Sequence, residues 1–274
     1  MASAWSGRFS ANLAMLFKDR GCLLDRFRYA RMAGFNAVEM STPELYNYRP
    51  QEVAAAMFGE GLRCVLFNAP AGDWSSGDRG LAALPGRSAE FRRSLDTALE
   101  YAAQLECQTV HCLAGIAPED PRHDQCYQES IAEASRAWAA EGVKTVIEPI
   151  NRRSMPGYHL SCMDRAASIL DSLAAVDGAS DRAGSAKLLF DVFHCQIMHG
   201  DLSARLRMHR EIIGHVQIAG VPDRAEPDAA QEINYPYLFR LLREELKYTG
   251  YIGCEYNPRA GTEAGLGWLT SVEP

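Results

Sequence analysis

Eight short apolar runs, rich in β-branched residues, recur along this chain and are separated by stretches with helical periodicity. Nearly every run ends in a polar or acidic residue; these are Asn12, Glu39, Asn68, His111, Glu148, Asp191, Gln217 and Glu255. A strand followed by a helix, eight times over, predicts an α/β fold of the parallel (β/α)₈ type, the TIM barrel. In such a barrel the carboxyl ends of the strands form a single rim, and active sites lie there.

We expect the strands at 9–13, 37–40, 63–67, 109–113, 144–147, 187–190, 213–218 and 251–255, and the helices at 23–33, 51–60, 87–105, 124–140, 163–174, 202–210 and 235–247. The helix at 87–105 has the clearest pattern, because its apolar residues form one stripe and its charged residues face away from it. A barrel needs about 250 residues. The 274 residues therefore predict one domain, 1–274, with a core at about 8–269.

The charge of the chain restricts its partners. A formal net charge of −7 argues against a nucleic-acid or anionic-membrane surface, since either requires clustered Lys and Arg. The first residues do not resemble a leader, and no apolar run has transmembrane length. The eight cysteines form no CxxC pair and are expected to be reduced. We therefore expect a cytoplasmic protein with a small-molecule substrate, and the sequence leaves a homo-oligomer open.

The last four rim positions, Glu148, Asp191, Gln217 and Glu255, offer mostly oxygen donors on consecutive strands. A hard divalent cation is the natural common partner of such a set, so these four are the candidate metal ligands. A single glutamate after a strand is usually solvated or caps a helix. Two glutamates in equivalent segments, with an aspartate between them on the same ring, favour a functional site.

Other polar residues near the rim are candidates for substrate binding. Asn68 and His111 are expected to contact substrate hydroxyls, and His194 follows Asp191 at a spacing that can place both in one pocket. For His194 a helix cap or a packed histidine is an equal alternative. Arg224 is the candidate anchor for an anion, because a guanidinium can bind a carboxylate through two parallel hydrogen bonds. An exposed loop arginine is its equal alternative.

Two further polar residues belong to strands. Glu39 can contact substrate, although a structural salt bridge is slightly favoured. His215 lies two residues before Gln217, so both side chains point to the same side of the strand and His215 lies one layer deeper. We expect His215 to orient a ligand rather than to bind metal.

Two loops stand out in composition. The segment 69–87 follows the third strand and contains Trp74, and a lid over the substrate is about as well supported as a static loop. The polar segment 177–186 precedes the sixth strand and is expected to be a flexible insertion on the opposite face. The chain contains no GxSxG, GxxxxGK[ST] or HExxH motif and no GxGxxG after the first strand, so the chemistries tied to these motifs find no support.

Several motifs together resemble those of hydroxypyruvate isomerases, a branch of the xylose-isomerase-like barrels that also includes 2-oxo-tetronate isomerases. They are RFSANLAMLF, AGDWSSGDRG with PGR, IEPIN with PGYHL, FDVFHCQ, GHVQIA, EINYPYLF, GCEYNP and TEAGLGWL. The resemblance covers nearly all of residues 9–269, and each motif falls at its expected strand or loop. The chain departs from many relatives at Phe67-Asn68, where they carry His-Asn, and this affects one rim contact.

The resemblance implies that Glu148 and Glu255 are the acid/base catalysts and that Glu148, Asp191, Gln217 and Glu255 form the metal shell. Related ketose epimerases have a histidine where this chain has Gln217, and the glutamine favours Mg²⁺ or Mn²⁺ over zinc. The implied reaction interconverts hydroxypyruvate and tartronate semialdehyde through an enediolate, and either glutamate can remove the proton. The substrate would be a small 2-oxo or 2-hydroxy acid.

Three alternatives remain open at this point. The same barrel could serve a 2-oxo-tetronate isomerase, or a C3-epimerase of free ketoses, although an anion anchor at Arg224 argues mildly against free sugars. A metabolite-binding protein without activity is the third alternative. The pair of glutamates speaks against it, because binding alone does not require two proton-transfer groups.

Overall fold

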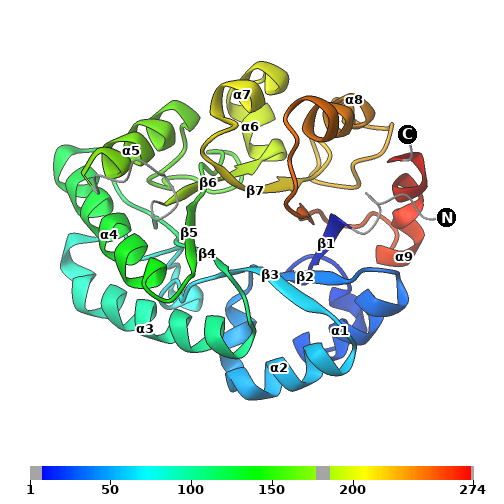
Figure 1. The fold of residues 1–274 in the computed structure, drawn as a ribbon, viewed down its shortest axis with the longest axis horizontal. Coiled ribbons are helices and arrows are strands. Elements are labelled where there is room, and N and C mark those ends of the chain that lie inside the picture. The colour runs from blue at the N-terminus through cyan, green and yellow to red at the C-terminus, as the bar shows by residue number, and fades with distance from the viewer. Residues whose placement is uncertain (1–7, 177–185, 273–274) are drawn as a thin grey trace.

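The computed structural model describes residues 8–176 and 186–272, and it shows a closed parallel barrel in which every strand pairs with the next and the last pairs with the first. The strands are β1 (Phe9–Asn12), β2 (Ala37–Met40), β3 (Arg63–Asn68), β4 (Thr109–His111), β5 (Lys144–Ile147), β6 (Lys187–Asp191), β7 (Ile213–Ile218) and β8 (Ile252–Cys254). Helices surround the strands in a ring (Figure 1). The predicted (β/α)₈ barrel is confirmed.

The helices are α1 (Leu23–Met32), α2 (Pro50–Gly59), α3 (Ser88–Gln104), α4 (Pro121–Ala139), α5 (Met163–Val176), α6 (Val192–Met198), α7 (Leu202–His209), α8 (Tyr235–Arg240) and α9 (Thr262–Gly265). A π-helical turn, Leu241–Glu245, continues α8. Short 3₁₀ turns lie at Lys18–Arg20, Pro43–Asn47, Trp74–Ser76, Pro85–Arg87 and Leu266–Val272. No helix in the described part of the chain has both the length and the apolarity to cross a membrane.

Most elements lie where the sequence places them, and α6 is the main difference. The apolar residues after Asp191 continue the pattern of the strand, so the sequence analysis gave no helix there. A helix begins because the Asp191 side chain caps it, accepting hydrogen bonds from the backbone N–H groups of Phe193 and His194 at 2.6 and 3.3 Å. The segment 177–186, expected to be a flexible insertion, lies outside the described residues except for Ala186.

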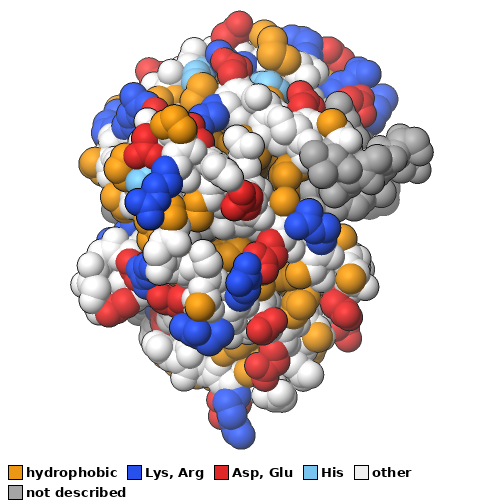
Figure 2. All heavy atoms as spheres, turned by 90° about the vertical axis from the view of Figure 1, so that its left-hand side faces the viewer, with side chains coloured by type: hydrophobic (Ala, Val, Ile, Leu, Met, Phe, Trp, Pro, Cys, Tyr) orange, Lys and Arg blue, Asp and Glu red, His pale blue; other side chains and the backbone are white. Residues whose placement is uncertain are grey.

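The outer helices pack on the barrel through the predicted apolar stripe. In α3, Phe91, Leu95 and Ala98 are buried, and Trp138 of α4 donates a hydrogen bond from Nε1 to the Leu95 carbonyl at 3.2 Å. Figure 2 shows the face formed by the helices at the left of Figure 1, where acidic and basic side chains are interspersed. The helices thus bury one face against the strands and expose a mixed charged face.

Inside the barrel an apolar layer lies below the polar rim. Leu66, Val146 and Leu189 form a separate buried cluster, and each lies two residues before a rim residue of its own strand segment. Side chains two residues apart in a strand point to the same side. The rim residues Glu148 and Asp191 therefore lie above a layer of buried apolar side chains.

The close packing of β8 against Glu39 yields a stability prediction. A Cβ atom at Gly253 would lie 2.2 Å and 2.5 Å from the two carboxylate oxygens of Glu39, whose side chain is fully buried. We expect Gly253→Ala to lower the free energy of unfolding by about 2–3 kcal/mol, because the carboxylate cannot move without losing hydrogen bonds. Urea denaturation followed by circular dichroism measures this difference.

Gly59→Ala is the matched control. Gly59 ends α2, and nothing lies within 4 Å of an added Cβ there. This variant should be as stable as the wild type or slightly more stable, since alanine favours a helix. Equal destabilisation by the two substitutions would contradict the packing argument.

Candidate active site

A cavity of about 300 Å³ opens at the carboxyl ends of the strands. Its lining includes six residues predicted from the sequence to act in the site, and these are Asn68, His111, Glu148, His194, Arg224 and Glu255. Trp74 contributes from the loop after β3. The two remaining candidates, Asp191 and Gln217, are buried and lie opposite each other in the register of β6 and β7. The barrel thus brings all of the predicted side chains to one region.

Glu39 lies at the base of this region and is fully buried. Its carboxylate lies 2.6 Å from His215 Nε2 and accepts hydrogen bonds from Gln217 Nε2 at 2.8 Å, Ser10 Oγ at 2.7 Å and Asn12 Nδ2 at 3.3 Å. Burial raises the pKa of Glu39, but the charge and hydrogen bonds of its neighbours outweigh burial and hold its pKa below the ordinary value. This pairing agrees with the expected structural salt bridge, and His215 orients Glu39.

Glu39 also fixes the orientation of two side-chain amides. An ionised carboxylate only accepts hydrogen bonds, so Gln217 must present its NH₂ group to Glu39. The carbonyl oxygen Oε1 of Gln217 is left buried, with no hydrogen-bond partner among the described residues. Asn12 donates from Nδ2 to Glu39 and, at 3.2 Å, to Glu255 Oε1, so it links the base of the site to the rim.

Three buried oxygens in the site lack a donor within the described chain, and they belong to Glu148 (Oε1), Asp191 (Oδ2) and Gln217 (Oε1). Asp191 uses its other oxygen to cap α6. Burial raises the pKa of Glu148 well above its ordinary value, and the nearby charges of Glu255 and Asp191 add to the shift. Buried carboxylates whose charge is only partly balanced and whose oxygens lack hydrogen bonds are costly, and a cation relieves that cost. This donor set therefore fits a divalent metal ion.

Glu148, Asp191 and His194 each offer a ligand atom, and these atoms lie within 4.8 Å of one another, so this triad could hold a metal ion. The hydrogen bonds of His194 decide whether its ring can coordinate a metal ion. The backbone N–H of Ser154 donates to Asn151 Oδ1 at 2.7 Å, which directs the Asn151 NH₂ group to His194 Nδ1 at 2.6 Å. The backbone N–H of Asn151 also donates to Nδ1, at 3.3 Å.

Because His194 Nδ1 accepts these hydrogen bonds, the proton of the neutral ring lies on Nε2. Nε2 is 3.6 Å from both Glu148 Oε1 and Asp191 Oδ2. A protonated nitrogen donates and does not coordinate. The geometry thus favours His194 as a hydrogen-bond donor at the cavity, and oxygens as the metal ligands. The sequence analysis missed Asn151, although it lies three residues after Glu148 in the same IEPIN motif.

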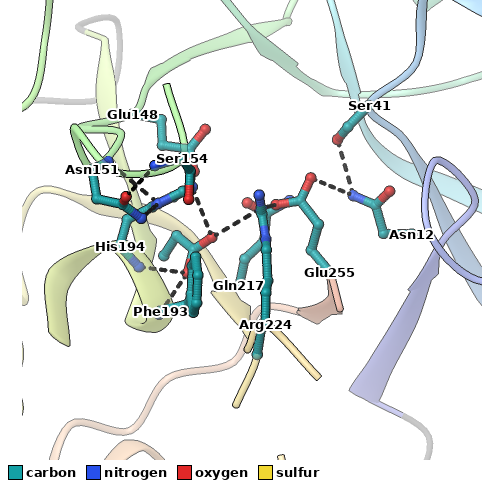
Figure 3. A network of polar contacts seen from close by, with 12 residues as sticks. Asn12, Ser41, Glu148, Asn151, Ser154, Phe193, His194, Gln217, Arg224 and Glu255 are labelled. Carbon is teal, nitrogen blue, oxygen red and sulfur yellow. Dashed lines mark hydrogen bonds and ion pairs between the residues drawn. The ribbon is translucent and has the colours of Figure 1, made fainter. Parts of the chain in front are cut away.

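Arg224 lies between the two sides of the site, with Glu148 and His194 on one side and Glu255 on the other (Figure 3). Its Nη2 donates to Glu255 Oε2 at 2.8 Å and lies 3.7 Å from Asp191 Oδ2, and its guanidinium stacks 5.1 Å from the ring centre of Phe193. Burial raises the pKa of Glu255 to about 7, and Arg224 opposes that rise. The sequence analysis gave Arg224 as a candidate anion anchor, with an exposed loop arginine as the equal alternative. The side chain is 19% exposed and its Nη2 is engaged by carboxylates of the protein, while its buried Nε has no hydrogen-bond partner among the described residues, so anion binding by Arg224 stays a prediction.

His111 and Asn68 form a pair on neighbouring strands. His111 Nδ1 lies 3.1 Å from Asn68 Oδ1, which can only accept, so Nδ1 carries the proton. Burial lowers the pKa of His111 to about 3, so the ring is neutral at physiological pH. Nδ1 also lies 3.7 Å from Glu148 Oε2, which places the His111 ring beside that carboxylate.

The loop after β3 is held by its own contacts. Asp73 caps the turn Trp74–Ser76, Arg79 stacks over the Trp74 ring at 4.0 Å, and Arg87 pairs with Asp78 at 2.5 Å. Trp74 lines the cavity. The lid hypothesis for this loop stays a prediction.

Comparison with known proteins identifies the family. The model of the xylose isomerase-like TIM barrel family matches residues 27–272. The chain is 47% identical over 265 residues to the 2-oxo-tetronate isomerase of Cupriavidus necator, covering 96% of this chain and 97% of that protein. This chain belongs to the xylose isomerase-like TIM barrel family.

Further relatives agree with this family. The hydroxypyruvate isomerase of Escherichia coli (strain K12) is 38% identical over 265 residues, which cover 96% of this chain and 98% of that protein. A crystal structure described as an AP endonuclease, family 2, from Brucella melitensis superposes with a TM-score of 0.88 at 38% identity, covering 98% of this chain and all of that one. Because the relatives from Cupriavidus necator and Escherichia coli are isomerases and each match covers 96% of this chain, this protein is an isomerase.

The assignment of the His194 proton can be tested without substrate. Nitrogen–proton correlation NMR of the chelator-treated protein at neutral pH should show Nε2 protonated and Nδ1 unprotonated, because Asn151 donates to Nδ1. In Asn151→Ala this preference should weaken. A wild-type spectrum with the proton on Nδ1 would contradict the assignment.

Proposed function

We propose that this protein is a metal-assisted isomerase of small 2-oxo acids that interconverts hydroxypyruvate and tartronate semialdehyde through an enediolate. The observation that carries the proposal is the pair of buried carboxyl groups, Glu148 and Glu255, that line one cavity beside buried oxygens without donors. Isomerisation moves a proton between adjacent carbons, which two such groups can perform. The names of the relatives from Cupriavidus necator and Escherichia coli support the reaction class.

We propose Glu148, Asp191, Gln217 and Glu255 as the metal ligands. The three oxygens without donors come from the first three, and the oxygens of Glu255 are held by Asn12 and Arg224. A set made only of oxygens suits Mg²⁺ or Mn²⁺. When bound, the ion would supply positive charge that stabilises the oxyanions of the enediolate.

The remaining roles follow from the geometry of the side chains. Glu148 and Glu255 are the proposed acid/base pair. One removes the proton from a substrate carbon, and either the other returns it to the neighbouring carbon, or the first performs both steps while the other supports the metal. His194 would donate a hydrogen bond from Nε2 to a substrate oxygen, since Asn151 holds its other nitrogen. Asn68 and His111, which lie beside Glu148, are proposed to contact substrate hydroxyls. Arg224 would hold Glu255 in position while it lines the pocket.

The experiment that tests the proposal follows tartronate semialdehyde formation from hydroxypyruvate. Glu148→Gln and Glu255→Gln should each lower kcat by about 10²–10⁴-fold, because each removes one proton-transfer group. Dialysis against a chelator should abolish activity, and Mg²⁺ or Mn²⁺ should restore it. Glu100→Gln, an exposed change on α3, is the control and should leave kcat as it is.

Full activity after chelation would rule out the role of the metal, and normal turnover by both glutamine variants would rule out the acid/base pair. A 2-oxo-tetronate isomerase is the second candidate, favoured by the relative from Cupriavidus necator. A panel of three- and four-carbon oxo acids, together with free ketoses, separates the two candidates by their kcat/KM values. Preferred turnover of free ketoses would instead indicate a C3-epimerase.

A further inference from the structure

We propose that Lys18, at the mouth of the active-site cavity, binds the carboxylate of the substrate and so selects 2-oxo acids over neutral sugars. This inference rests on the proposed function, because it names the residue that recognises the acid group of the same substrate. Lys18 lines the cavity together with Glu148 and Glu255. The sequence analysis did not single it out.

One lysine and one arginine, Lys18 and Arg224, line the cavity. Arg224 shares its charge with the carboxylates of the protein, since its Nη2 donates to Glu255 at 2.8 Å and lies 3.7 Å from Asp191, and its buried Nε has no hydrogen-bond partner among the described residues. Lys18 is exposed, and the described residues include no hydrogen-bond or ion-pair partner for it. The ammonium group of Lys18 is therefore available to an incoming anion.

The charge of the site also favours a cationic side chain for the substrate carboxylate. Glu148, Asp191 and Glu255 contribute three carboxylates, and Arg224 together with a divalent ion would balance them. A substrate carboxylate then adds a negative charge that the inner site does not balance. Lys18, which lines the same cavity, supplies positive charge for that carboxylate.

The backbone before Lys18 is held in an unusual conformation. Phe17, just before Lys18, has a φ of 59°, in the left-handed region that a bulky residue rarely adopts. The conformation is held because the Phe17 ring is fully buried, packed against Phe35, and because its N–H donates to the buried Thr262 hydroxyl at 2.7 Å. Strained residues held in this way cluster at functional sites. Here the left-handed conformation of Phe17 leads the chain into the turn Lys18–Arg20, whose first residue lines the cavity.

Lys18→Gln tests the proposal. The KM for hydroxypyruvate should rise about tenfold, with a much smaller change in kcat, because a charged hydrogen bond to the substrate is lost while the reacting groups stay in place. Lys18→Arg keeps the charge and should recover most of the affinity. Lys247→Gln removes an equal charge from an exposed site just before β8 and should leave KM unchanged.

A binding measurement separates this inference from the proposed function. Calorimetric titration with tartronate, a hydroxy diacid that this reaction cannot isomerise, should show about tenfold weaker binding to Lys18→Gln than to the wild type or Lys247→Gln. If no oxo acid is turned over but this difference appears, the proposed function fails and the role of Lys18 stands. Equal tartronate affinity and equal KM in Lys18→Gln and wild type would overturn the inference, as would a wild type that does not bind tartronate.

Discussion

The arrangement of the site depends on one buried carboxylate, that of Glu39. Four side chains from β1 and β7 converge on it, and Gly253 of β8 leaves just enough room for it. Because an ionised carboxylate only accepts hydrogen bonds, it turns the amide of Gln217 so that the carbonyl oxygen is left for another partner. Through Asn12 the same carboxylate reaches Glu255. Glu39, one layer deeper in the barrel, thus sets the orientation of Gln217 and contacts Glu255 through Asn12.

The same principle of fixed orientation applies on the other side of the site. Ser154 orients Asn151, and Asn151 in turn fixes which nitrogen of His194 carries the proton. Arg224 then occupies the space between the two sides and partly compensates the carboxylates. Burial without full compensation raises the pKa of Glu148, Asp191 and Glu255. The site thus carries negative charge that Arg224 balances only in part. The proposed cation would balance the rest, and the proposed role of Lys18 is to balance the carboxylate of the substrate.

The sequence predicted the barrel and the rim because both follow from local periodicity. Glu148 and Asp191 each follow an apolar, β-branched run, and the carboxyl ends of the strands form the active-site face of a barrel. The orientation of side chains could not be predicted in this way: the role of Asn151 depends on a turn that returns to His194, and the pairing of Arg224 with Glu255 joins two loops. Helix α6 was missed because its apolar start, Val192 and Phe193, is also typical of a strand. Tertiary contacts decided each of these cases.

The buried oxygens of Glu148, Asp191 and Gln217, together with Glu255, are proposed to form a cation site, with His194 outside the coordination shell. Anomalous diffraction from crystals soaked in Mn²⁺ would locate the ion. This ligand assignment predicts one strong peak within coordination distance of all four oxygen-bearing side chains, with Nε2 of His194 too far away to coordinate. A peak bonded to His194, or no peak among these side chains at saturating Mn²⁺, would contradict it.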